Sequence, residues 1–340
     1  MASDPAIIGE SQALTVAELT DPAELEALAP EWRALLERCP QATPFQTPEW
    51  LIAWRRAFLP QGLWTLAFRG DGRLVALAPM FIHGRSDGRR QLTLLGNGLS
   101  DRLDLIAEPA ARRAAAAALF RHLARRKLWD LCDFRDLPAD SPLLAAAAEG
   151  RSRLAPEAPC PTLALPHDPA EVLGRLPKSR RTDLRRCARR LAELGAVRFE
   201  LADAAGRASA LAAVMALHAR RWNERGEAGV FAEPRVRGFH EAVTGDLLAA
   251  GMLRLHVLRL GERPIAAQYG IVQGASAYSY IHAFDPAFAR FGPGWLLMAH
   301  VLQSAVREGL RSFDFLRGRE AYKYDWGAAD RPQVRRRIWR

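Results

Sequence analysis

The residue types best suited to acid–base chemistry lie in the last quarter of the chain. In the run SAYSYIHAF (276–284), Tyr278, Tyr280, His282 and Phe284 occupy alternate positions, and alternate residues of a strand share one face. Histidine titrates near neutral pH, and a tyrosine hydroxyl can protonate a departing thiolate. Tyr280 and His282 are therefore candidate catalytic residues. A packed, noncatalytic sheet face is the alternative interpretation of the same stripe.

Lys323 is the second candidate, because lysine is rare in this chain. Only three of the 48 basic residues are lysines, and the other 45 are arginines. A lysine retained in such a chain favours a need for a compact, titratable ammonium group, which can stabilise charge that develops on a carbonyl or a leaving group. We expect Lys323 to lie on a loop over the active cleft. An ordinary exposed loop lysine is the alternative.

Three more polar residues belong to neighbouring strands. Asp314 and Arg317 follow the strand-like run FDFL (313–316), at a strand end of the kind that often holds ligands in α/β folds. Asp314 is a candidate catalytic residue and Arg317 a candidate substrate contact, although the two can equally form a structural ion pair. Gln268, in the run PIAAQYGIVQ (264–273), is a candidate for binding and orienting the substrate that accepts a transferred group.

A glycine-rich turn indicates an anion site. Arg290-Phe291-Gly292-Pro293-Gly294 lies between a strand and a helix that begins near Trp295. Free N–H groups at a helix N-terminus and the positive end of the helix dipole can hold a pyrophosphate. We expect Arg290, Gly292, Gly294 and Trp295 to bind the cofactor. Any glycine-rich turn from strand to helix has the same appearance.

Two helices carry further candidates. The amphipathic helix expected over 206–224 contains LHARRW (217–222), in which His218 and Trp222 are candidate substrate contacts or packed residues of a helix face. The basic helix expected over 176–195 carries seven positive charges and one negative charge before Leu191. This helix either attracts an anionic partner or is the solvated face of a docked helix.

The order of elements predicts an α/β (α+β) fold of two similar units. In the second half, the strand at 197–201 and helices at 206–224 and 235–250 precede three strands, a helix at 295–309, the FDFL strand and a last strand at 334–339. The first half repeats this order, with helices at 22–38 and 48–59, a hairpin across Gly70-Asp71-Gly72, strands at 91–96 and 102–107, a helix at 110–127 and a strand at 128–134.

These elements divide the chain into three parts. We expect one unit at 10–150, a proline-rich linker with a short strand at 162–165 over 151–176, and a second unit at 177–340. The two units are interpreted as a diverged duplication in which each sheet is mixed and mostly antiparallel. Two unrelated α/β units are the alternative.

Composition limits the class of protein. The 340 residues suffice for two domains, and no apolar run reaches the roughly 20 residues of a membrane-spanning helix. The four cysteines are scattered without metal-ligand spacing, so we expect no metal site. The N-terminal residues lack the pattern of a signal peptide, and the expected location is the cytoplasm. The net charge of +10 reflects either a compositional bias towards arginine or attraction to an anionic partner such as coenzyme A, tRNA or a membrane surface.

Several stretches together resemble the CelD/BcsL family of the GNAT acyltransferase superfamily. They are PFQTPEWLIAWRRAF (44–58), LLGNGLSDRLDLI (94–106), LHARRW (217–222), IHAFDPAFARFGPGWLLM (281–298) and GLRSFDFLRGREAYKYDWG (309–327). The step Tyr322-Lys323 is similar to an aromatic-lysine step of the FemAB-like aminoacyl ligases, which have a duplicated fold. The GNAT phosphate-loop signature is Q/R-x-x-G-x-G/A, and here Ala289 holds the basic position.

The resemblance implies tandem GNAT-like units and transfer of an acyl group, acetyl above all, from acyl-CoA to an amine or hydroxyl. The CelD/BcsL name links this activity to cellulose or exopolysaccharide production, hence to a cell-envelope, glycan or lipid-linked acceptor and to peripheral association with a membrane. Tyr322 would then contact substrate. The alternatives are a FemAB-like ligase that takes its aminoacyl group from tRNA and a noncatalytic accessory protein of polysaccharide synthesis.

Overall fold

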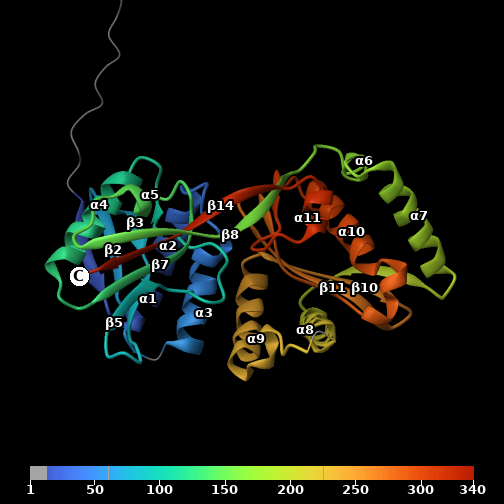
Figure 1. The fold of residues 1–340 in the computed structure, drawn as a ribbon, viewed down its shortest axis with the longest axis horizontal. Helices are drawn as coiled ribbons and strands as arrows, with labels where there is room; N and C mark the ends of the chain where they lie inside the picture. Colours follow the sequence, from blue (N-terminus) through green and yellow to red (C-terminus); the bar gives the residue numbers. More distant parts are fainter. Residues whose placement is uncertain (1–13, 60, 225) are drawn as a thin grey trace, which may run out of the picture.

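Two α/β units lie side by side along the long axis of the molecule (Figure 1). The computed structural model describes residues 14–59, 61–224 and 226–340, so residues 10–13 of the expected first unit lie outside the described residues. Within the described residues, no helix combines the length and the apolar character needed to cross a membrane.

The first unit is built from the elements up to β7, and the segment after it leads to the second unit. These elements are β1 (Thr15–Leu19), α1 (Pro22–Ala27), α2 (Ala29–Glu37), η1 (Pro44–Gln46), α3 (Pro48–Phe58), β2 (Thr65–Gly70), β3 (Arg73–Ala78), β4 (Met80–Gly84), β5 (Arg90–Leu94), β6 (Ile106–Ala107), α4 (Arg112–Arg125), β7 (Leu131–Pro138), α5 (Pro142–Ala145) and β8 (Arg151–Ala164).

The second unit follows the expected order closely. Its elements are α6 (Glu171–Gly174), α7 (Lys178–Ala192), β9 (Val197–Leu201), α8 (Arg207–Asn223), η2 (Val230–Ala232), α9 (Pro234–Ala249), β10 (Leu253–Leu260), β11 (Arg263–Gln273), β12 (Ser276–Phe284), η3 (Pro286–Phe291), α10 (Pro293–Arg307), β13 (Ser312–Asp314), α11 (Ala321–Asp325) and β14 (Ala329–Trp339).

Strand pairing confirms that the two units repeat one plan. In the second unit β10, β11 and β12 pair antiparallel and β12 then pairs parallel with β13. In the first unit β2 pairs antiparallel with β3, β4 pairs antiparallel with β5, and β5 pairs parallel with β7. A helix, α4 or α10, precedes the parallel strand in each unit. The fold is thus a tandem of mixed, mostly antiparallel sheets flanked by helices.

The strand that completes each sheet comes from the other half of the chain. β8 follows the first unit in sequence but pairs antiparallel with β13 of the second unit, and the C-terminal β14 returns to pair antiparallel with β7 of the first. β8 and β14 also pair with each other, so the sheet runs continuously as β4-β5-β7-β14-β8-β13-β12-β11-β10-β9. Figure 1 shows these two strands crossing between the units, with the C-terminus in the first.

One of the two exchanged strands lies in the segment expected to be a linker, residues 151–176. Residues 151–164 form the long strand β8 rather than an irregular crossover with a strand at 162–165. Pro156 pairs with Val334 of β14 in the part of β8 that has no second neighbouring strand among the described residues, and Pro159 lies at the irregularity between the pairs of Glu157 and Cys160. An edge position tolerates a residue without an N–H group, which explains why proline content alone was misleading there.

Proline also explains two smaller differences in the first unit. The helix expected over 22–38 is two helices, since Pro30, which has no N–H to donate, lies in the first turn of α2. The second strand of the hairpin expected across Gly70-Asp71-Gly72 is followed by a separate strand, because β3 and β4 are divided at Pro79. Most of the strand expected over 102–107 belongs to a connection at 95–105, which leaves only β6 in the sheet.

An aromatic cluster joins the two units beneath the shared sheet. Trp50 of α3 meets Phe239 of α9 edge to face, with ring centroids 5.0 Å apart, and meets Tyr280 of β12 at 5.3 Å. Trp50 is fully buried. Burial of large aromatic side chains supplies much of the stability of such contacts, so the units are fixed to each other rather than hinged.

Candidate functional site

An opening in the second sheet forms where β12 and β13 separate. The two parallel strands pair only at Ser276↔Ser312, Ala277↔Phe313 and Tyr278↔Asp314. Beyond Tyr278, β12 continues to Phe284 while β13 ends, so within the described part of the chain no strand pairs with that edge of β12. Unpaired backbone N–H and C=O groups on such an edge need partners from water or from a ligand.

A bulge in β12 corrects the expected catalytic stripe. The register with β11 shifts between Tyr269↔Ile281 and Gly270↔Ser279, so Tyr280 is an extra residue. One extra residue reverses the faces of the side chains that follow. Tyr280 therefore packs in the cluster with Trp50 from the first unit, whereas His282 lines a pocket formed with α10. The two candidate acid–base residues do not share a face.

The cleft pocket occupies the opening between β12 and the chain that follows β13. It is a cavity of about 240 Å³ with mostly apolar walls. Its lining residues are Arg221, His282, Phe284, Ala289, Gly292, Pro293, Gly294, Trp295, Met298, Tyr322 and Trp326. It thus brings together five residues proposed from the sequence: His282, Gly292, Gly294, Trp295 and Tyr322.

The N-terminus of α10 forms one side of the cleft pocket. Gly292 is the N-cap residue, with the left-handed φ of 56° that glycine adopts without strain, and no side chain caps the helix. Pro293 has no N–H, so Gly294 and Trp295 supply the N–H groups of the first turn that lack carbonyl partners within the helix. A Cβ on Gly294 would lie 3.0 Å from Phe284 Cδ1 and 3.1 Å from His282 Nε2. The absence of a side chain at Gly294 therefore lets the start of α10 lie close to the rings of His282 and Phe284.

The turn before α10 differs from the expected phosphate loop. Residues 286–291 form the 3-10 helix η3, and the N–H of Gly292 donates to the carbonyl of Ala289. Arg290 is exposed, with its guanidinium over the ring of Phe291 at 4.8 Å, and it does not line the pocket. The anion-binding capacity of this turn is consequently concentrated in Gly294 and Trp295.

Two nitrogen atoms in the walls of the cleft pocket are buried without a hydrogen-bond partner: Nδ1 of His282 and Nε1 of Trp326. Burial, with a smaller contribution from the Arg221 charge, lowers the pKa of His282 to about 4, so the ring is neutral at pH 7. Buried polar atoms are normally paired, and a ligand with hydrogen-bonding groups can supply the missing partners.

Two arginines at the cleft pocket were not singled out from the sequence. Arg221 of α8 donates to the carbonyl of His282 at 3.3 Å, and its guanidinium lies 5.4 Å from the ring of Phe284. Arg180 of α7 lies over the Trp295 ring at 4.5 Å. Arg221 belongs to LHARRW, so the stretch was noted but His218 and Trp222 were chosen from it. Helical spacing shows only which residues share a face, and the pocket was needed to identify which face binds.

Lys323 is buried rather than exposed over the cleft. Its side chain is 3% exposed and Nζ donates to the carbonyls of Leu316, Arg317 and Gly318 at 3.0, 3.1 and 3.2 Å, with Glu320 at 2.8 Å. Leu316 has a positive φ of 58°, which is unusual for a residue other than glycine. The ammonium group therefore holds the turn after β13 in a strained conformation. The effect of Lys323 on turnover stays a prediction.

Asp314 and Arg317 form ion pairs with the first unit and not with each other. Asp314 accepts from Arg102 at 2.8 Å, and Arg317 pairs with Asp101 at 2.8 Å and with Asp136 at 3.1 Å. Of the three partners, Asp101 and Arg102 belong to the connection at 95–105 and Asp136 to β7. The ion pair between Asp314 and Arg317, noted from the sequence as an alternative, does not form, because each of the two residues pairs with the first unit.

The other sequence candidates lie outside the cleft pocket. The Tyr280 hydroxyl donates to the carbonyl of Leu99 at 3.0 Å, and burial raises the pKa of Tyr280 well above its usual value. Gln268 is buried and its amide donates to Ser279 at 3.4 Å. His218 packs against Trp222 and Phe231 in the second unit. None of these residues lines the cleft pocket.

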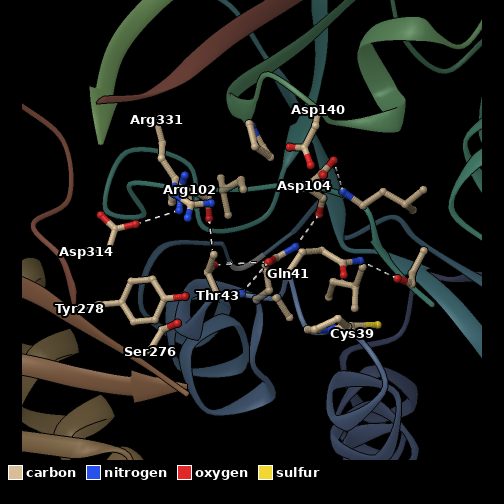
Figure 2. A pocket seen from close by; sticks show the side chains of 18 of the residues that line it. Cys39, Gln41, Thr43, Arg102, Asp104, Asp140, Ser276, Tyr278, Asp314 and Arg331 are labelled. Atoms are coloured by element: carbon tan, nitrogen blue, oxygen red, sulfur yellow. Dashed lines mark hydrogen bonds and ion pairs between the residues drawn. The ribbon is translucent and has the colours of Figure 1, made fainter. Parts of the chain in front are cut away.

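A second cavity, the interface pocket, lies between the two units (Figure 2). Its volume is about 250 Å³ and its walls are strongly polar. The polar lining residues are Gln41, Thr43, Gln46, Arg102, Asp104, Arg112, Asp140, Thr162, Ser276, Tyr278, Ser312, Asp314 and Arg331. Among these lining residues, Asp314 is the one that the sequence predicted as a catalytic residue, and the sequence did not predict this pocket.

Asp104, in the wall of the interface pocket, makes stability depend on pH. Burial raises the pKa of Asp104 to about 7, against the opposing effects of hydrogen bonds from Ser141 and the N–H of Leu105. The folded state then retains a proton that the unfolded state loses above about pH 4. We expect the free energy of unfolding to fall as pH rises from about 4 to about 7, by up to a few kcal/mol.

Chemical denaturation of Asp104→Asn across this pH range measures the effect. The variant is expected to flatten the pH dependence, and the control Asp246→Asn, exposed on α9 and outside the interface pocket, is expected to leave it unchanged. Equal slopes for Asp104→Asn and the wild type would contradict the assignment.

The described residues contain no group of three or more His, Cys, Asp and Glu side chains able to hold a metal ion. All four cysteines are free thiols, and burial raises the pKa of Cys39 to about 11. The same effect raises the pKa of Cys132 and Cys160. A protonated, buried thiol is a poor nucleophile, so these three residues do not present a thiolate for covalent catalysis.

Comparisons with known proteins agree with this geometry. Residues 178–324 match the family described as an acetyltransferase (GNAT) domain, which covers the cleft pocket through Tyr322. No curated protein matches the sequence.

Solved structures share the fold of the whole chain. A crystal structure of FemX has a TM-score of 0.66 at 13% identity, covering 95% of this chain and 97% of FemX. The C-terminal domain of a putative lysylphosphatidylglycerol synthetase from Agrobacterium fabrum has a TM-score of 0.58 at 13% identity, with 93% and 92% covered. A tandem GNAT protein from the clavulanic acid biosynthesis pathway has a TM-score of 0.52 at 16% identity, with 96% and 98% covered. Residues 178–324 are therefore similar to a GNAT acetyltransferase domain, within a two-unit fold that these structures share.

Proposed function

We propose that the protein is an acyltransferase that binds acyl-CoA in the cleft pocket and transfers its acyl group, with acetyl-CoA as the main donor. The observation that carries the proposal is the opening between β12 and β13, which holds an apolar pocket beside the uncapped N-terminus of α10. The match of residues 178–324 to a GNAT acetyltransferase domain supports it.

The pocket chemistry suits a pantetheine thioester. Gly294 and Trp295 offer N–H groups to phosphate oxygens, with Arg221 beside them. The unpaired edge of β12 offers backbone groups to the amides of the pantetheine arm, and Trp326 Nε1 offers a further donor. The aromatic walls accept the apolar part of the arm.

The transfer itself needs no covalent enzyme intermediate. The acceptor nitrogen or oxygen attacks the thioester carbonyl carbon, the C–N or C–O bond forms, and the C–S bond breaks. The proton of the acceptor passes to a base or to water, and the leaving thiolate takes up a proton as free coenzyme A. Backbone N–H groups of β12 that face the opening stabilise the carbonyl oxygen as it becomes negative. The neutral His282 can accept a hydrogen bond within the pocket.

Aminoacyl-tRNA is the second candidate donor, and two observations favour it. The first is η3, whose internal hydrogen bonds leave few N–H groups for a pyrophosphate. The second is α7, which borders the cleft through Arg180 and exposes Lys178, Arg185, Arg186, Arg189 and Arg190 to solvent. A row of exposed arginines is suited to a nucleic-acid backbone. The two-unit fold shared with FemX is compatible with both donors.

For the acceptor, we propose an amine or hydroxyl of a cell-envelope or polysaccharide-related molecule, with the protein associating peripherally with the membrane where the acceptor is lipid-linked. This part rests on the resemblance to the CelD/BcsL family. If the protein consumes neither acyl-CoA nor aminoacyl-tRNA, the remaining alternative is a noncatalytic accessory function in polysaccharide synthesis.

Gly294→Val tests the donor site. The Cβ of the added side chain would lie only 3.0 Å from Phe284 Cδ1 and 3.1 Å from His282 Nε2. The rest of the valine would therefore crowd these rings and close the pocket. We expect acetyl-CoA affinity to fall at least about tenfold, equivalent to about 1.4 kcal/mol, in isothermal titration calorimetry. Gly245→Ala, on α9 and with open space around the added Cβ, is the control. Unchanged affinity in Gly294→Val would place the donor elsewhere.

A further inference from the structure

The interface pocket is built from both units. The first unit supplies Ile106 and Ala107 of β6, Arg112 at the start of α4 and Pro138 at the end of β7. The second unit supplies residues of β12, β13 and β14. The walls of the interface pocket are polar, whereas those of the cleft pocket are mostly apolar, so the two pockets differ in chemistry.

The second unit closes the interface pocket with one polar face of its sheet. Ser276 pairs with Ser312, and Tyr278 pairs with Asp314, so these four residues lie on neighbouring strands at alternate positions. The hydroxyls of Ser276 and Ser312 are 2.7 Å apart. Thr162 on β8 is the register partner of Asp314 and extends the same face. A wall of hydroxyl groups can both donate to and accept from a polyhydroxylated ligand.

The charges around the interface pocket leave a positive side. Figure 2 shows Arg102 between Arg331 and Thr43, with its guanidinium bonded to Asp314. The Nε atoms of Arg102 and Arg112 are buried and have no hydrogen-bond partner. Arg331 is exposed at the pocket wall, and no ion pair to it occurs among the described residues.

The acidic groups of the pocket pair with Arg102 and Arg112, which leaves Arg331 as the pocket arginine without an ion pair among the described residues. Asp314 is 3% exposed at the side chain and bonded to Arg102, and Asp104 accepts from Ser141 and from the N–H of Leu105. Asp140, with a side chain that is 77% exposed, lies 3.8 Å from Arg112. The pocket therefore favours a ligand with an anionic group near Arg331 and Arg102 and with hydroxyl groups elsewhere.

We propose that the interface pocket binds the acceptor of the acyl transfer, and that the acceptor is a small polyhydroxylated molecule carrying a carboxylate or phosphate group. The assignment of an acceptor rests on the proposed function. Tyr278 and Asp314 are the last residues to pair before β12 and β13 separate, so both pockets border one opening. Tyr278 and His282 are four positions apart, at most about 13 Å of strand, which the extended arm of a donor has to cross.

The test is calorimetric titration of the full chain, without any acyl donor, with glucose 6-phosphate, glucuronate, inorganic phosphate and neutral glucose. We expect one or both anionic sugars to bind with a Kd of about 1 mM or tighter and glucose to bind at least about tenfold more weakly. Arg331→Gln is expected to weaken the anionic sugar at least about tenfold, while the exposed Arg153→Gln on β8, outside the pocket, leaves it unchanged.

Three results would overturn this proposal: no saturable binding of either anionic sugar, equal binding of glucose, or an Arg331→Gln variant with wild-type affinity. Binding of inorganic phosphate alone would also overturn it, because the hydroxyl wall would then have no role. Gly294→Val separates the two proposals. This variant is expected to lose acetyl-CoA binding but to keep binding the anionic sugar. The sugar titration therefore tests the interface pocket even if the donor assignment fails.

Discussion

A chain that ends at Ala328 is expected not to form the first unit. The truncation removes β14, which pairs with β7 on one side and with β8 on the other. It also removes Ile338, which is 1% exposed in the core, and Arg336, whose guanidinium lies over the Phe120 ring at 4.7 Å. Loss of a central strand of eleven residues costs a large part of the roughly 5–15 kcal/mol of a typical folded protein.

Hydrogen exchange of the amides in β7 measures this directly, since protection reports local opening. The full chain is expected to protect them, and the truncated chain to exchange them rapidly. A peptide of residues 329–340 added in trans is expected to restore part of the protection. Full protection of β7 in the truncated chain would contradict the strand exchange.

Replacement of Lys323 is expected to damage both stability and turnover. Lys323→Met leaves the carbonyls of Leu316, Arg317 and Gly318 without the ammonium that satisfies them, and leaves Glu320 unpaired. Leaving a buried acceptor unsatisfied costs about 1–3 kcal/mol, and the loss of the pair with Glu320, which is 54% exposed, adds little. The turn beside the opening then loses the contact that holds the positive φ of Leu316. This stability cost is larger than an exposed loop lysine would have.

Lys323→Arg distinguishes this structural role from a simple need for charge. A planar guanidinium does not match three carbonyls arranged around one ammonium, so we expect a loss of stability of about 1–3 kcal/mol in denaturant unfolding. The exposed Lys127→Arg is the matched control and is expected to change little. A Lys323→Arg protein with wild-type stability and wild-type turnover would refute both the structural and the catalytic roles. A variant with wild-type stability but lost turnover would instead support the direct catalytic role.

Local patterns predicted the second unit well because its elements are strongly periodic. The strand at 197–201 and the three strands from 252 to 284 appear within one or two residues of their expected bounds. The exchange of β8 and β14 was not predicted, since two long strands with alternative partners have the same local sequence in either arrangement. Only long-range packing decides which sheet each strand joins.

The candidate site was predicted in part, for a similar reason. The glycine turn and Tyr322 are encoded close to one another and line the cleft pocket. The bulge at Tyr280 was not visible in a pattern of alternate residues, and it moved Tyr280 and His282 to opposite faces. The interface pocket draws residues from 39 to 331, so no single stretch of sequence could have indicated it.

Hydrogen exchange of the full chain with and without acetyl-CoA tests the central claim, that the acyl donor binds in the opening between β12 and β13. We expect acetyl-CoA to protect those amides of residues 279–284 that β11 does not bond, and the amides of Gly294 and Trp295, because His282, Phe284, Gly294 and Trp295 line the cleft pocket. The Gly294→Val variant is expected to show no such protection. The claim would be contradicted if saturating acetyl-CoA left the exchange of these amides unchanged in the wild type. Protection of the same amides by aminoacyl-tRNA and not by acetyl-CoA would show that the site binds the second candidate donor.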